Sequence, residues 1–74
     1  SERTYSDWEA GLFNWINSNI ENGGTDLLSE ALPKFERIMI KAALQQTGGK
    51  RQESAKLLGW GRNTLTRKIK ELGL

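Results

Sequence analysis

Apolar side chains in the first third of the chain recur at helical spacing, at Trp8, Leu12, Trp15 with Ile16, and Ile20. Ser6, followed three residues later by Glu9, is the capping-box pattern that begins a helix. Asn22-Gly23-Gly24 ends it, because tandem glycines accept left-handed geometry and resist continuation. The pattern therefore predicts a first helix from Ser6 to about Asn22.

The middle of the chain predicts a long helix with an uncertain start. Thr25 or Asp26 can cap a helical segment, which extends to residue 47. Pro33 either begins a fresh helix, at a position where its missing N–H costs nothing, or kinks a continuous one. The sequence leaves these two alternatives open, while the helical pattern from Pro33 to about Gln46 is clear.

This middle helix carries two apolar stripes. The first consists of Phe35, Ile38, Met39, Ala42 and Gln46, and the second of Ile40, Ala43 and Leu44. An apolar surface this wide exceeds what a helix on the surface of one domain needs. We expect it to contact the rest of its own domain and also a second copy of the chain.

The last 25 residues predict two short helices joined by a tight turn. Thr47-Gly48-Gly49 closes the middle helix, and a helix from Arg51 to Leu58 stops at Gly59. With Gly61 as N-cap, Leu65, Ile69 and Leu72 of the final helix face the core. Because no period-2 alternation occurs and valine is absent, the fold class is all-α, a small helical domain.

The turn has the spacing of a helix-turn-helix. Ala55, a small residue where two helices can cross, lies four residues before Gly59, and the inward Leu65 lies six after it. Trp60 and Leu65 stand at hydrophobic-staple spacing, so the indole can set the angle at which the last helix leaves the turn. The second helix of such a motif enters the major groove of DNA.

The amino-acid composition excludes several kinds of functional site. The 74-residue chain has no cysteine and no histidine, which excludes disulfides and the usual zinc sites and favours oligomerisation as a source of stability. Gly48-Gly49-Lys50-Arg51 lacks the upstream glycine and the Ser/Thr of a P-loop. We expect no enzymatic activity, no cofactor and no metal in this segment. No membrane span or signal peptide is visible, and the missing initiator Met suggests a fragment of a larger protein.

Charge is distributed unevenly. Residues 1–46 hold four basic and seven acidic residues, whereas residues 47–74 hold seven basic and two acidic ones. Asn63, Arg67 and Lys70 point almost directly away from the core face of the last helix, with Thr64 and Thr66 on its flanks. This asymmetry predicts a polyanion partner, the alternative being an ordinary solubilising face.

The outward residues suit DNA. The forked guanidinium of Arg67 can donate to guanine O6 and N7, and the Asn63 amide can pair with adenine. Thr64 and Thr66 can contact a thymine methyl or a phosphate. Phosphate contacts are expected from residues on both helices of the motif, namely Lys50, Arg51, Gln52, Lys68 and Lys70.

The stretch "LLGWGRNTLTRKIKELG", Leu57 to Gly73, closely resembles the C-terminal domain of NtrC-type enhancer-binding proteins, which share a Fis-like helix-turn-helix. Leu27 to Arg37 and Ala43 to Ala55 are similar at a looser level. The sequence departs from Fis itself in two places. Gly61 stands where Fis carries a side-chain cap, and the Fis-like N-terminal hairpin is absent.

The resemblance implies a single DNA-binding and dimerising domain, with residues 1–24 as a dimerisation helix, residues 26–47 as the long helix and residues 50–73 as the helix-turn-helix. Base contacts would fall on Arg62, Asn63, Thr64, Thr66 and Arg67. The homodimer would be built from the first helix and the middle helix, through Trp8, Leu12, Trp15, Ile16, Phe35, Ile38, Met39 and Ala42.

The parent protein implied by the resemblance is a bacterial activator with a receiver domain and an AAA+ ATPase. It would be cytoplasmic and nucleoid-associated, and would bind an inverted-repeat enhancer site as partner of sigma-54 RNA polymerase. Two alternatives stay open. A Fis-like architectural protein would bend DNA with weak base preference. A helical protein-interaction module would show no salt-linked DNA affinity.

Overall fold

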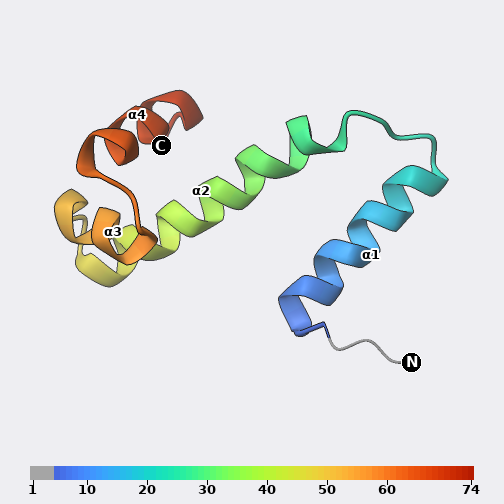
Figure 1. Ribbon diagram of the computed structural model, residues 1–74, viewed down its shortest axis with the longest axis horizontal. Coiled ribbons are helices and arrows are strands. Elements are labelled where there is room, and N and C mark those ends of the chain that lie inside the picture. The colour runs from blue at the N-terminus through green and yellow to red at the C-terminus, as the bar shows by residue number, and fades with distance from the viewer. Residues whose placement is uncertain (1–4) are drawn as a thin grey trace. The chain divides into compact units, whose positions relative to one another are not determined.

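The computed structural model describes residues 5–74, and that part of the chain consists of helices and connecting turns without a strand (Figure 1). The four helices are α1 (Asp7–Glu21), α2 (Leu27–Thr47), α3 (Arg51–Leu58) and α4 (Arg62–Leu72). The all-α fold class is therefore confirmed. The chain divides into two compact units, Ser1–Glu30 and Ala31–Leu74. The assignment of all 74 residues to one domain stays a prediction.

The first unit is dominated by α1, which begins where the capping pattern predicts. The Glu9 carboxylate accepts hydrogen bonds from the Ser6 backbone N–H and from the Ser6 hydroxyl, both at 3.1 Å. Phe13, which lies off the apolar stripe, makes a tilted ring contact with Tyr5, with 5.2 Å between the ring centroids. No residue of α1 is buried, so its apolar stripe contributes little to the core of this chain.

All four helices end with the same pair of backbone hydrogen bonds. At the end of α3, the Trp60 N–H donates to the Ala55 carbonyl at 2.9 Å and the Gly59 N–H donates to the Lys56 carbonyl at 3.2 Å. This is a Schellman cap, and it needs the left-handed backbone that Gly59 adopts at φ +82°. Because these caps are local, the sequence places the helix ends correctly.

The structure answers the question that Pro33 raised, because α2 is one continuous helix with Pro33 inside it. Pro33 has no N–H, so the Ser29 carbonyl one turn earlier receives no helical hydrogen bond from it. The helix starts directly after Asp26, which has left-handed backbone at φ +55°. The Asp26 carboxylate accepts a hydrogen bond from the Ser29 hydroxyl at 2.9 Å.

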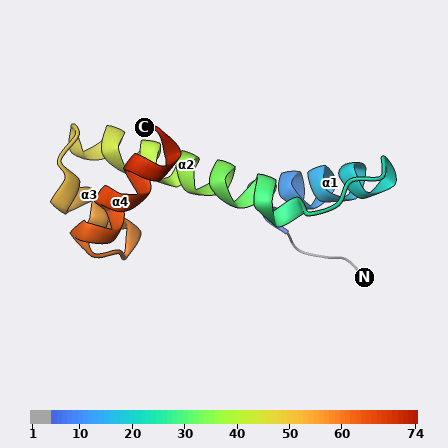
Figure 2. The same cartoon turned by 90° about the horizontal axis from the view of Figure 1, so that it is seen from above.

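The core of the second unit lies where α3 and α4 meet the C-terminal half of α2 (Figure 2). It consists of Ile40, Ala55, Leu65 and Ile69, each 5 % exposed or less, with Leu44, Leu58, Trp60 and Leu72 packed around them. The second stripe of the middle helix thus faces its own domain. The first stripe remains exposed, with Ile38 68 % accessible to solvent.

Candidate nucleic-acid interface

The helix-turn-helix is formed by α3, a turn of three residues and α4. Gly61 is the N-cap of α4, as expected, with extended backbone. Trp60 packs against the cluster that contains the fully buried Leu65, which agrees with the hydrophobic staple. The turn therefore holds α4 through an apolar anchor at its first residues.

Two hydroxyls fix the other helix of the motif. Ser54 of α3 is fully buried, and its hydroxyl donates to the Ala43 carbonyl of α2 at 3.2 Å. The hydroxyls of Ser54 and Thr47 lie 2.7 Å apart. Sequence reasoning missed this network, because a serine near the start of a helix ordinarily signals solvent or a cap. The sequence held one indication that Ser54 is buried, namely its position one residue before the inward Ala55.

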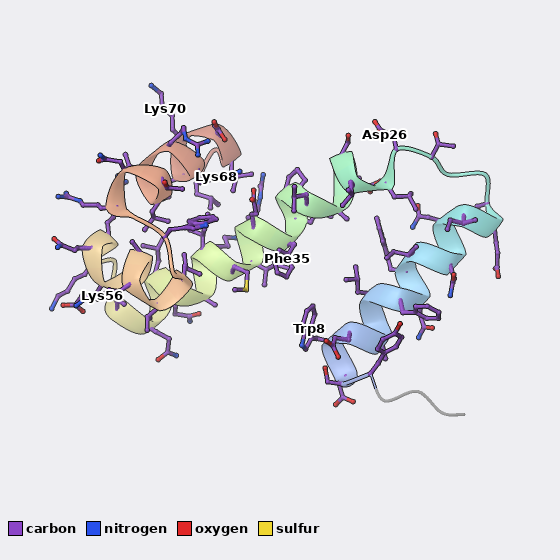
Figure 3. The ribbon with its side chains drawn as sticks, in the orientation of Figure 1. Trp8, Asp26, Phe35, Lys56, Lys68 and Lys70 are labelled. Atoms are coloured by element: carbon purple, nitrogen blue, oxygen red, sulfur yellow. The ribbon has the colours of Figure 1, made fainter. Side chains whose placement is uncertain are left out.

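The outward face of α4 presents polar and basic side chains. Asn63, Thr66, Arg67 and Lys70 are exposed on it, Thr64 is half-buried, and Arg62 is exposed at the first turn of the helix. Figure 3 shows Lys70 pointing away from the ribbon. Four of the five side chains expected on this face and its flanks therefore lie in solvent on one helix, at a spacing that a groove of DNA could contact together.

One ion pair lies along this face. The Arg67 guanidinium contacts the Glu71 carboxylate at 3.1 Å, one turn further along α4, and the two side chains are 57 % and 52 % exposed. An exposed pair of this kind stabilises a helix by only about 0.3–0.5 kcal/mol. Since a guanidinium has five N–H donors, Arg67 keeps donors available for a ligand.

Lys68 differs from its neighbours on α4. Its ammonium contacts the Glu36 carboxylate of α2 at 3.1 Å, and the two side chains are only 22 % and 16 % exposed. The structure therefore does not bring Lys68 to the outward face. Helical geometry explains why Lys68 is not on the outward face, because it lies three residues after Leu65 and so only about 60° from the core direction.

The start of α3 carries two cations, Lys50 and Arg51, beside the neutral Gln52, with the acidic Glu53 next in the same turn. Lys50, Arg51 and Gln52 are exposed, and Lys50 is the N-cap residue. The Thr47 hydroxyl at the end of α2 lies 3.2 Å from the Lys50 carbonyl, within hydrogen-bond distance. The amide groups at the start of α3 and these cations together favour an anion.

Within residues 5–74, no group of three or more His, Cys, Asp or Glu side chains could hold a metal ion. In the same part of the chain, no helix is long and apolar enough to cross a membrane.

Comparison with protein families identifies the fold. Residues 31–72 match the family described as "Bacterial regulatory protein, Fis family". The chain belongs to the Fis family. The matched region corresponds to the second unit, which holds α3, α4 and the part of α2 that packs on them. The family match therefore covers the whole helix-turn-helix and leaves out α1.

Curated relatives extend the similarity of this Fis-family chain to its full length. It is 49 % identical over 74 residues to the "DNA-binding transcriptional regulator NtrC" of Escherichia coli (strain K12), which covers all of this chain and 16 % of that protein. The protein of the same name from Salmonella typhimurium is 52 % identical over 67 residues, or 90 % of this chain and 14 % of the relative.

These relatives confirm the resemblance to NtrC-type proteins. The chain spans about one sixth of the length of the relatives it matches. No solved structure matches it significantly.

Proposed function

We propose that this chain binds double-stranded DNA sequence-specifically, as the DNA-binding part of an NtrC-like transcriptional activator. The observation that carries the proposal is the outward face of α4, where Asn63, Thr66, Arg67 and Lys70 are exposed together, with Arg62 exposed at the first turn of the same helix. The names of the relatives support the same conclusion. Catalysis is not part of the proposed role of this segment.

In the proposed complex α4 lies in the major groove, which displays a different donor and acceptor pattern for each base pair. Arg67 donates two hydrogen bonds to O6 and N7 of a guanine, from the donors that its contact with Glu71 leaves available. Asn63 pairs with an adenine. Thr66 contacts a thymine methyl or a phosphate, and Arg62 and Thr64 contact bases at the entrance of the helix.

Contacts with the DNA phosphates complete the proposed interface. Lys50, Arg51 and Gln52 receive one phosphate at the start of α3, and Lys70 contacts another beside α4. We do not extend this role to Lys68, because its ammonium is held by Glu36 below the outward face. Phosphate contacts give affinity and register, so the base preference depends on α4.

We further propose that the chain acts as a homodimer. The exposed stripe of α2 comprises Phe35, Ile38, Met39 and Ala42, and Trp8, Leu12, Trp15 and Ile16 lie on α1, where no residue is buried. A domain of this size has little core of its own, so covering these residues with a second copy would add stability. Two recognition helices would then reach successive major grooves about 34 Å apart.

The rest of the proposal concerns the parent protein. A receiver domain and an AAA+ ATPase precede the DNA-binding part, and the dimer binds an inverted-repeat enhancer site for sigma-54 RNA polymerase. The whole protein acts in the bacterial cytoplasm, at the nucleoid.

Selection from a random duplex library at two salt concentrations tests the proposed function. We expect enrichment of a two-fold symmetric site, with half-sites about one helical turn apart. Salt-sensitive binding without enrichment would favour an architectural DNA-bending protein. An absence of DNA binding at low salt would favour the alternative function, a helical protein-interaction module.

Sedimentation equilibrium at micromolar concentration tests the homodimer. We expect a dimer for the unaltered chain and a monomer for Ile38→Lys, which places a charge in the exposed stripe of α2. Leu57→Lys is the matched control, because Leu57 lies on α3 and is 64 % exposed, close to the 68 % of Ile38. A monomer for the unaltered chain would contradict the proposal.

A further inference from the structure

The ion pair between Glu36 and Lys68 joins α2 to the recognition helix across 32 residues of sequence. Its two side chains are 22 % and 16 % exposed, whereas those of the Arg67–Glu71 pair on the same helix are more than half exposed. Partial removal from water strengthens the attraction between the two charges and makes the loss of either one costly. The pair therefore constrains α4 more strongly than an ordinary surface contact.

The surroundings of Glu36 are apolar. It lines an open groove together with Leu32, Phe35 and Met39 of α2 and with Leu58 and Trp60 of the helix-turn-helix. The only charged group among these lining residues is the Glu36 carboxylate. A carboxylate in such a place needs a cation, and Lys68 supplies it through a long apolar stem.

Two attachments hold α4 on α2. Leu65 and Ile69 belong to the same buried cluster as Ile40, and this apolar contact is not directional. The ion pair attaches α4 a second time, at Glu36, which lies one turn before Ile40 on α2. An apolar contact alone permits α4 to rotate or slide, whereas a second, directional contact fixes its angle relative to α2.

We propose that Glu36 and Lys68 are positioning residues for DNA recognition, and that their ion pair sets the angle between the recognition helix and α2. This inference rests on the proposed function. Because α2 also carries the proposed dimer stripe, the same angle sets the distance between the two recognition helices of the dimer. The pair then determines which half-site spacing the dimer accepts, although neither residue touches a base.

A double-mutant cycle on the 74-residue chain tests the inference, with Glu36→Gln, Lys68→Met and the double variant. The DNA probes are the selected site, the same site with one base pair added or removed between the half-sites, and a random duplex. We expect each single variant to lose about tenfold in affinity for the selected site and to discriminate less between spacings. The double variant should lose no more than either single variant, because each change breaks the same contact.

A phosphate contact by Lys68 would give a different pattern. Lys68→Met would then weaken the selected and random duplexes alike and flatten the salt dependence, while Glu36→Gln would leave the spacing preference intact. That pattern would overturn the inference, as would wild-type spacing preference in both single variants. Glu21→Gln, an equal change of charge at an exposed position of α1, is the matched control and should alter neither preference.

Thermal unfolding at the same protein concentration shows whether each variant is folded in the assay. If a single variant is unfolded, the charge-swapped Glu36→Lys/Lys68→Glu variant replaces it. Recovery of the spacing preference by the swap supports the inference, and a folded swap without that preference overturns it. Failure of the proposed function is distinguishable, because the unaltered chain would then select no site at all.

Discussion

Replacing Ser54 with alanine removes a buried hydroxyl and leaves the rest of the core unchanged. The Ser54 hydroxyl donates to the Ala43 carbonyl at 3.2 Å, so its contact with Thr47 at 2.7 Å uses the Thr47 proton. Ser54→Ala therefore deletes two hydrogen bonds between α3 and the end of α2. The Thr47 hydroxyl can still donate to the Lys50 carbonyl, 3.2 Å away, and is not left unsatisfied.

The expected loss of stability follows from these contacts. One of the two lost hydrogen bonds is replaced by the bond from Thr47 to the Lys50 carbonyl, so the net loss is one hydrogen bond, about 1 kcal/mol. Alanine is the better helix former by about 0.5 kcal/mol, which offsets part of that loss. The free energy of unfolding should therefore fall by about 0.5 kcal/mol. In a domain of 60–100 residues, this lowers the melting temperature by roughly 2–4 °C.

Thermal unfolding followed by circular dichroism measures the change, at one protein concentration because a dimer melts at a concentration-dependent temperature. Thr66→Ala is the control, since it removes an exposed hydroxyl from α4 in the same unit; it carries the same gain in helix propensity, about 0.5 kcal/mol, and should melt slightly above the unaltered chain. If Ser54→Ala melts at the same temperature as Thr66→Ala, the buried hydroxyls do not stabilise the packing of α3 on α2.

Two further predictions concern binding and packing. Lys70→Ala should weaken the selected and random duplexes alike and lower the slope of log affinity against log salt by about 0.9, in fluorescence anisotropy titrations. A loss confined to the selected site would show that Lys70 contacts a base. Trp60→Ala should lower the free energy of unfolding by about 2 kcal/mol, less than for a fully buried tryptophan, because Trp60 is half-buried. Trp60→Phe should lose clearly less free energy of unfolding in the same thermal melts. Equal losses in the two variants would contradict the packing of Trp60 on Leu65 as a hydrophobic staple.

The helix boundaries were predictable because the signals that set them are local. Ser6 with Glu9, Gly59 and Gly61 all stand where the structure begins or ends a helix. The continuity of α2 through Pro33 was not predictable, because one lost hydrogen bond must be weighed against packing that the sequence does not show. The outward face of α4 followed from helical geometry alone, once Leu65 and Ile69 were taken as its core residues.

The contacts between distant residues were the part that sequence patterns could not supply. Glu36 and Lys68 each look like surface charges, and nothing in the spacing along the chain indicates that they meet. Ser54 and Thr47 likewise become a buried pair only when α3 folds back on α2. Both contacts depend on the angle between helices, which follows from packing and not from periodicity.

Methylation interference on the selected duplex tests most directly whether α4 reads bases in the major groove. Methylation of guanine N7 blocks the acceptor that an arginine would use there. We expect interference at one guanine in each half-site for the unaltered chain, and its disappearance for Arg67→Ala, with a loss of about 1–3 kcal/mol in binding. An absence of interference at every guanine, or the same pattern in both proteins, would contradict base recognition by Arg67.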